Sequence, residues 1–353
     1  MIESSRVLRL LFASSGKGEP HLYTAVWSVL HFLVDFVCAW AMYAYFGAGN
    51  CENLLIYNFC AFALQLPFGT LLDLCREKHH KVPAIFAMIG IVPTLCGTVI
   101  HPALLGIGNA LFHIGAGVDV MEEDFDKNRK GRDLGIFVAP GAIGLYFGAQ
   151  LGKMFTVPVV AIFAGMIMVT LIFIYLKRAP VYDWHISNAP QKHGKQLLLT
   201  VCCFAVVVVR SFVGLSVTFS WKSVPLLCAL AVTGTALGKC FGGFLAARFG
   251  IGRTAVYSLL LASVCYSIGN IGVFGLVAIF LFNMTMPLTL YLLAENLPGM
   301  RGFSFGLLTF GLFLGFLPVY WQMNLAIPPE ILGAIGSVIS CVLLIMAGKA
   351  AKL

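Results

Sequence analysis

The sequence has little charge. Only 11% of its 353 residues are Asp, Glu, Lys or Arg, whereas 59% are hydrophobic, and the mean hydropathy is +0.92. A soluble domain carries about 25% charged residues because its surface faces water. The shortage of charge therefore excludes a soluble globular protein and indicates a chain that presents much of its surface to lipid.

Motifs of several enzyme and pump classes are missing as well. The 11 cysteines contain no C-x-x-C spacing for a metal or redox centre, and no G-x-x-x-x-G-K-[ST] segment provides an ATP-binding loop. Residues 1–20 contain no cleavable signal sequence, because their one apolar run is short and is interrupted by Arg9. We interpret the cysteines as small packing residues and expect no disulfide framework, no metal site and no cofactor.

Long apolar runs are what the sequence has in abundance. A helix needs about 20 residues to cross a bilayer, and runs of this length give twelve predicted membrane helices. Their ranges are 22–46, 53–72, 82–100, 102–121, 135–152, 155–176, 197–221, 226–247, 255–270, 272–297, 303–321 and 331–347. The predicted fold class is an all-α polytopic membrane protein with twelve transmembrane helices.

Basic residues fall unevenly between these helices. With both termini in the cytoplasm, the inside segments hold 19 of the 23 Lys and Arg residues, and the outside loops hold only Lys153 and Lys222. Cytoplasmic loops are enriched in Lys and Arg. Topology therefore accounts for the net charge of +8, without a nucleic-acid partner. We expect a multi-pass protein of the plasma membrane, specifically a bacterial inner membrane, with both termini cytoplasmic.

The two halves of the chain resemble each other. A shift of 174 residues places Gly69 on Gly243 and Asn109 on Asn283. Two similar six-helix halves, related by an axis along the membrane normal, are a known transporter plan. The predicted organisation is an N-terminal cytoplasmic segment 1–21, a six-helix bundle 22–178, a polar linker 179–196 and a second six-helix bundle 197–353.

Two loop motifs carry a resemblance to a known family. Residues 69–78, G-T-L-L-D-L-C-R-E-K, resemble the signature between helices 2 and 3 of the major facilitator superfamily. Residues 243–253 resemble its degenerate copy between helices 8 and 9. A carboxylate at the end of a helix can meet another helix N-terminus or a neighbouring Arg. The resemblance implies that the following residues form a gate that stabilises one of two states: Gly69, Asp73, Arg76, Gly243 and Arg248.

Helix 5 and three shorter strings refine this resemblance. Pro140 and Gly141 belong to a Gly/Pro pattern similar to that of the superfamily's antiporters. Residues 31–35, 112–113 and 210–214 resemble the superfamily's fosmidomycin-resistance branch. The resemblance covers essentially the whole chain and implies a secondary transporter, with export or antiport favoured. The chain departs from the branch after Phe-His and is short for the family, which leaves the substrate open.

Ionisable residues lie deep within the predicted helices. Asp35, Arg210 and Lys239 fall near the centres of helices 1, 7 and 8, where each costs about 2.5–3.5 kcal/mol if it faces lipid. They must therefore face the bundle interior or a cavity. His31 stands one turn from Asp35 on the same helix face, and His113 lies at similar depth in helix 4. We expect these residues to share a central site.

The charge of this site predicts its ligand. One carboxylate and two cations leave a net positive charge, which favours an anionic solute because uncompensated charge is costly in a low dielectric. Arginine binds carboxylates and phosphonates bidentately, and lysine adds a point charge. We predict that substrate is bound by Arg210, Lys239, Asn109, His113 and Asn283. We predict that protons are carried by Asp35 and His31.

Structural roles are open for the same residues. Asp35 and Arg210 could form a permanent salt bridge, and Lys239 could pair with a carbonyl. The histidines and asparagines could join helices by hydrogen bonds, and Asp73 could simply end its helix. For function, we expect a monomeric, proton-coupled secondary transporter that moves a small organic anion or drug and is not an enzyme. The alternative is a membrane-embedded enzyme or lipid-handling protein, for which no catalytic motif is found.

Overall fold

The structure is a computed structural model that describes residues 22–47, 49–76, 81–157, 159–178, 193–323 and 326–351. Every regular element in these ranges is helical, and none is a β-strand. The predicted N-terminal segment 1–21, most of the predicted linker (179–192) and both chain ends lie outside the described residues.

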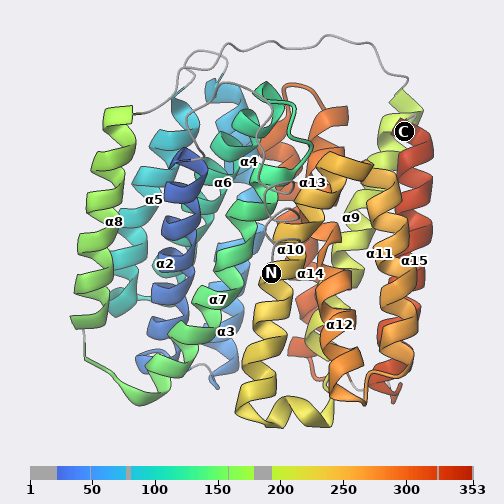
Figure 1. Ribbon diagram of the computed structural model, residues 1–353. Coiled ribbons are helices and arrows are strands. Elements are labelled where there is room, and N and C mark those ends of the chain that lie inside the picture. Colours follow the sequence, from blue (N-terminus) through green and yellow to red (C-terminus); the bar gives the residue numbers. More distant parts are fainter. Residues whose placement is uncertain are drawn as a thin grey trace, which may run out of the picture.

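The helices divide along the sequence into two sets, shown in blue to green and in yellow to red (Figure 1). The first half contains α2 (Leu22–Ala44), α3 (Cys51–Asn58), η1 (Phe59–Ala63), α4 (Gln65–Arg76), α5 (Val82–Ile100), α6 (Pro102–Asp126), α7 (Arg132–Met154) and α8 (Val159–Arg178). The second half contains α9 (His193–Ser216), η2 (Ser220–Ser223), α10 (Pro225–Phe249), α11 (Ile251–Ser267), α12 (Gly272–Asn283), α13 (Thr285–Asn296), α14 (Arg301–Tyr320) and α15 (Pro329–Ala351).

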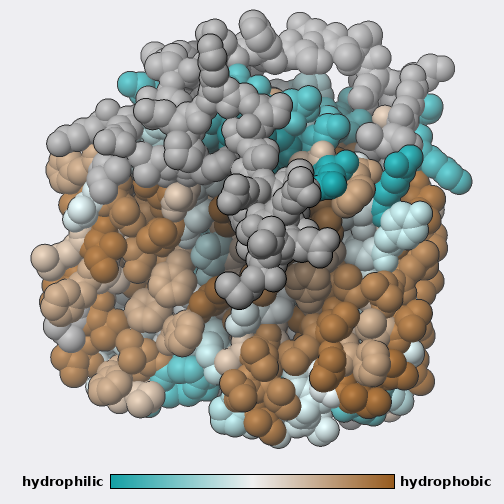
Figure 2. Space-filling view, viewed as in Figure 1, coloured by the Kyte–Doolittle hydropathy of each residue, from teal (hydrophilic) through white to brown (hydrophobic). Residues whose placement is uncertain are grey.

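These elements correspond to the twelve predicted membrane helices. Within the described ranges, ten continuous helical segments are long and apolar enough to cross a membrane. The other two are α8, with a shorter apolar stretch at Val160–Phe173, and α11, with 17 residues. Hydrophobic side chains cover the middle of the visible face, and hydrophilic ones gather towards its upper and lower edges (Figure 2). The predicted fold class is confirmed.

Several predicted boundaries are wrong. Predicted helix 2 is not one regular helix, because the π-helical η1 separates α3 from α4, and predicted helix 10 is broken at Met284 between α12 and α13. Predicted helix 7 ends at residue 221, but α9 runs from His193 to Ser216, so the last residues of the predicted linker are helical. The residues after α9 look like a continuation of that helix by hydropathy because Phe219 and Trp221, before and within the short helix η2, are apolar and buried.

Two pairs of helices, α4 with α14 and α7 with α10, make most of the contact between the halves. Glycine allows the backbones to approach closely at both crossings. A Cβ at Gly69 would lie 2.1 Å from the carbonyl oxygen of Gly302, and a Cβ at Gly243 would lie 2.4 Å from that of Gly131. The two glycines that the internal repeat pairs therefore occupy equivalent contacts between the halves.

Candidate functional site

Four polar side chains of the first half meet between α2 and α6. His31 Nε2 lies 3.2 Å from Asp35 Oδ2, and His113 Nε2 lies 3.6 Å from Asp35 Oδ1. Asn109 Nδ2 donates a hydrogen bond to Asp35 Oδ1 at 3.2 Å. Each helix supplies its pair at i and i+4, which places both side chains on one helix face. We call His31, Asp35, Asn109 and His113 the central cluster.

Helix α7 packs against the central cluster beside Pro140. Proline has no N–H, so the carbonyl of Ile136 lacks its usual helical donor, and the Ser28 hydroxyl lies 3.3 Å from that carbonyl. The next carbonyl, that of Phe137, lies 2.7 Å from His31 Nδ1. Proline in α7 therefore frees backbone oxygen at the place where α2 presents polar side chains.

Gly141 completes this contact. A Cβ at this position would lie 2.4 Å from His31 Nε2 and 2.5 Å from Asp35 Oδ2. Any larger residue would displace one of the two groups, so the helix 5 glycine is explained by its contact with the His31–Asp35 pair. The Gly/Pro pattern of predicted helix 5 includes Gly141, but the sequence does not indicate its contact with the cluster.

Two cations of the second half face the same interior. Lys239 on α10 interacts electrostatically with Asp35 and His113 and with Arg210 on α9. Arg210 is 8% exposed, and its Nη1 has no hydrogen-bond partner within the described part of the chain. A buried donor left unpaired is costly, more so when it is charged. Arg210 is therefore an interior cation without a protein partner on that nitrogen.

The structure decides between some of the alternative roles of the buried residues. Within 4 Å, the ionisable partners of Asp35 in the described ranges are the two histidines, so a permanent Asp35–Arg210 salt bridge is not formed. Asn283 does not join the central cluster directly. Its amide donates to the Ile279 carbonyl of its own helix at 2.8 Å, and it lies beside Gly238 on α10.

His31, Asp35 and His113 also have the composition of a metal site. One ligand atom from each residue lies within 4.8 Å of the others. Both imidazoles contact a backbone carbonyl through Nδ1, as metal-bound histidines do. The neighbouring cations Lys239 and Arg210 oppose a divalent ion, because like charges repel strongly in a low dielectric. The absence of a metal site stays a prediction.

Asp73 contacts the other half of the molecule. Its carboxylate accepts hydrogen bonds from the backbone N–H groups of Gly302 at 2.8 Å and Phe303 at 2.7 Å. These residues form the first turn of α14, where N–H groups have no partner within the helix and the helix dipole favours negative charge. The carboxylate thus meets a helix N-terminus, one of the two contacts expected for it.

A second contact between the halves lies beside the first. Arg301 at the start of α14 forms an ion pair with Glu122 on α6, and its guanidinium lies 4.3 Å from the centre of the Phe125 ring. The Phe125 ring stacks on Tyr291 of α13 at 4.4 Å. We call Asp73, Glu122 and Arg301 the latch.

Sequence analysis missed Glu122 and Arg301. The available signal was the acidic run Glu122-Glu123-Asp124 at the end of an otherwise apolar helix. Buried carboxylates need partners, and this run is followed by the basic residues of the next loop. Pairing that run with Arg301 requires the three-dimensional fold, because the partner comes from the other half.

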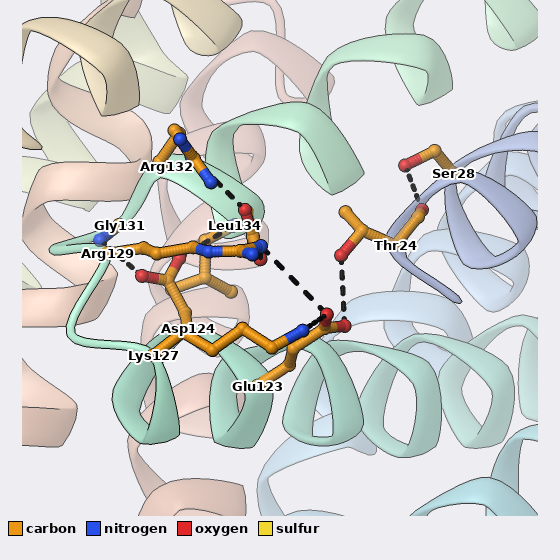
Figure 3. A network of polar contacts seen from close by, with 10 residues as sticks. Thr24, Ser28, Glu123, Asp124, Lys127, Arg129, Gly131, Arg132 and Leu134 are labelled. Carbon is orange, nitrogen blue, oxygen red and sulfur yellow. Dashed lines mark hydrogen bonds and ion pairs between the residues drawn. The ribbon is translucent and has the colours of Figure 1, made fainter. Parts of the chain in front are cut away.

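The same acidic run fastens α7 to α6 (Figure 3). Asp124 accepts from the N–H groups of Gly131 at 2.8 Å and Leu134 at 3.0 Å, so it caps the start of α7. Gly131 has φ +89°, a conformation that favours glycine. Glu123 is contacted by three side chains: Thr24, Lys127 and Arg129. The α6–α7 connection is therefore tied to α2 within the first half.

Of the two predicted gate arginines, Arg248 does not contact the latch among the described residues. Arg248 is exposed near the end of α10, and its guanidinium lies 5.5 Å from the ring of its neighbour Phe249. Arg76 is the last residue of α4, and its side chain lies outside the described residues. The second copy of the loop motif thus contributes Gly243 to the contact between the halves, while Arg248 does not contribute.

Comparison with known proteins identifies the fold. No family model matches the chain, and no curated protein matches it. Solved structures of transporters match over nearly the whole chain, among them two of the same symporter and one of a human transporter. A variant of the E. coli fucose:proton symporter FucP has a TM-score of 0.67 and 13% identity, and the match covers 93% of this chain and 97% of that one.

The other two matches are of similar quality. The major facilitator superfamily transporter FucP in the outward conformation has a TM-score of 0.66 and 13% identity, with 93% of this chain and 99% of that chain covered. The human organic anion transporter MFSD10 (TETRAN) has a TM-score of 0.65 and 14% identity, with 94% and 100% covered. The chain therefore has the fold of major facilitator superfamily transporters. All three structures are of transporters.

Proposed function

We propose that the protein is a secondary active transporter that moves a small anionic organic solute or drug by alternating access, coupled to protons. The observation that supports this most directly is the buried Nη1 of Arg210, which has no hydrogen-bond partner among the described residues and faces the same interior as Lys239 and the central cluster. The fold of the solved neighbours supports secondary transport as the general class.

An anion is the solute that this charge distribution favours. Arg210 and Lys239 carry two positive charges, and Asp35, which lies in electrostatic range of Lys239, is engaged by two histidines and an asparagine. A carboxylate or phosphonate between the two cations would supply the missing partner of Arg210 and reduce the repulsion between them. The human neighbour is described as an organic anion transporter, which is consistent with this assignment.

Asp35 is the proposed proton carrier, assisted by His31. Carboxylates and histidines buried in membrane helices form proton relays in pumps and transporters. One solved neighbour is a fucose:proton symporter. Export or antiport is the favoured direction, because Pro140 and Gly141 fit the Gly/Pro pattern of antiporters. We also propose that the protein is a member of the fosmidomycin-resistance branch and acts as a monomer. Its proposed location is a bacterial inner membrane, with both termini in the cytoplasm.

The latch is the proposed gate at one end of the molecule. Asp73 and Glu122 of the first half hold Arg301 and the first turn of α14 in the second half. Alternating access then requires these contacts to break while the halves rock around the central cations. In this proposal the present state is closed at the latch.

A thermal-shift screen of purified protein tests the proposed ligand class. We expect organic acids or phosphonates to raise the melting temperature, because a ligand that binds only the folded state stabilises it. Arg210→Ala should abolish this stabilisation. Arg253→Ala, which removes an exposed arginine on α11, is the matched control and should preserve it. Stabilisation by cationic drugs alone would contradict the anion assignment.

A further inference from the structure

Both histidines of the central cluster have one ring nitrogen engaged by the backbone. His31 Nδ1 lies 2.7 Å from the carbonyl oxygen of Phe137, and His113 Nδ1 lies 2.8 Å from that of Asn109. A carbonyl oxygen accepts hydrogen bonds and cannot donate them. Each Nδ1 must therefore carry the ring hydrogen, and each Nε2 is left to face Asp35.

This arrangement determines where a further proton is needed. If both histidines were neutral and Asp35 ionised, each Nε2 would direct a lone pair at the carboxylate, at 3.2 Å for His31 and 3.6 Å for His113. No hydrogen would lie in either contact, and the repulsion would be strong at a buried site. A proton shared by Asp35 and His31 Nε2 allows a hydrogen bond at 3.2 Å, and a proton on His113 Nε2 turns the 3.6 Å contact into an attractive ion pair.

We propose that His31, Asp35 and His113 act as one proton-holding unit that keeps a proton in the state closed at the latch. His113 is then a proton-coupling residue instead of the substrate ligand that the sequence predicted. This inference rests on the proposed function and deepens it. Phe137 and Asn109 act through the histidines, because their carbonyls fix which nitrogen of each ring faces Asp35.

The surroundings limit how many protons the unit holds. The ionisable groups around it are Cys38 on α2, Tyr57 on α3 and Lys239 on α10, and Arg210 on α9 interacts with Lys239. Lys239 lies in electrostatic range of Asp35 and His113, so its positive charge makes a second positive charge in the unit unfavourable. Asn109 donates to Asp35 Oδ1, which favours keeping negative charge on that oxygen. One proton shared by three groups satisfies these constraints.

Nuclear magnetic resonance of the full protein with ¹⁵N-labelled histidine tests the inference. The chain has 8 histidines, and single His→Gln variants assign His31 and His113. We expect both rings to keep hydrogen on Nδ1 and to titrate over a common pH range. His31→Gln should move the His113 midpoint by about one pH unit, as expected for coupled groups. His101→Gln, at the exposed junction of α5 and α6, should leave both unchanged.

The wild-type spectrum is decisive by itself if a variant fails to fold. Hydrogen on Nε2 with Nδ1 bare, in either ring, would overturn the inference, as would independent titrations of the two rings. A metal ion retained by the purified protein and lost in His113→Gln would also overturn it, because the three residues would then form a metal centre. Independent titrations together with intact proton-driven transport would reject the shared unit and keep the proposed function.

Discussion

At the scale of single residues, the buried charges fall into those that have protein partners and those that do not. Asp35 is surrounded by His31, His113 and Asn109, whereas Arg210 keeps an unpartnered nitrogen within the described ranges. Buried polar groups normally find partners in a folded protein. We propose that a proton is the partner of Asp35 and an anionic solute the partner of Arg210.

Gly141→Ala should disturb the central cluster directly. The new Cβ would lie 2.4 Å from His31 Nε2, so the His31–Asp35 contact has to open. Overpacking of this kind costs about 1–3 kcal/mol of stability. We expect a lower melting temperature and a loss of proton-driven transport. Gly214→Ala, which meets nothing within 4 Å on α9, is the control. Equal effects of the two changes would contradict the assigned role of Gly141.

Asp73→Asn should weaken the latch without disturbing the central cluster. Asparagine keeps one acceptor oxygen for the first turn of α14 but loses the charge that the helix dipole favours. Loss of a capping group costs about 1 kcal/mol, roughly a fivefold shift between the two states. Hydrogen exchange of the Gly302 and Phe303 amides measures the effect, and it should become faster. Asp126→Asn, at an exposed position on the same side of α6 as the latch, should leave it unchanged.

At the scale of helices, α7 connects the central cluster with the boundary between the halves. Its Phe137 carbonyl contacts His31, and the start of the same helix packs on α10, next to the backbone of Lys239. A change at the cluster that displaces α7 therefore also alters the α7–α10 contact. The cap that Asp124 provides holds the start of α7 to α6.

Gly69→Ala should favour the state in which the latch is open. A Cβ at this position would lie 2.1 Å from the Gly302 carbonyl oxygen, so α4 and α14 could not stay as close as they are. Spin labels at the exposed residues Lys81 and Arg253, one in each half, report the separation. We expect the population of long distances to rise. Gly252→Ala, with open space around it, should reproduce the wild-type distances; an unchanged Gly69→Ala distribution would count against the gate.

Sequence patterns locate helices better than they locate irregularities within helices. The twelve apolar runs match the observed helices because hydropathy reports contact with lipid, and the break at His101 and Pro102 was predicted. The π-helical turn at Phe59–Ala63 and the interruption at Met284 were not. Residues in both stay as apolar as their neighbours, so hydropathy cannot separate them from regular helix.

At the scale of the whole molecule, the sequence predicts how deep the ionisable residues lie in the membrane, but it does not predict which residues they contact. Asp35, Arg210 and Lys239 were expected in one interior because none of them could face lipid, and the structure brings them into one electrostatic environment. The partners of Asp35 depend on the rotation of α2, α6 and α7 about their axes, which no single sequence pattern determines. The role of His113 as a substrate ligand stays a prediction, and the sequence did not indicate that its ring lies 3.6 Å from Asp35.

Transport by purified protein in liposomes is the measurement that tests the central claim most directly. The anion outside the liposomes is one that stabilises the protein in the thermal-shift screen, and a pH gradient is imposed across the membrane. We expect wild-type protein to move this anion at a rate that rises with the gradient. Asp35→Asn should still bind the anion but lose gradient-driven transport, and Arg210→Ala should lose binding. Full gradient-driven transport by Asp35→Asn would show that Asp35 does not couple protons to the solute, and the account would be wrong.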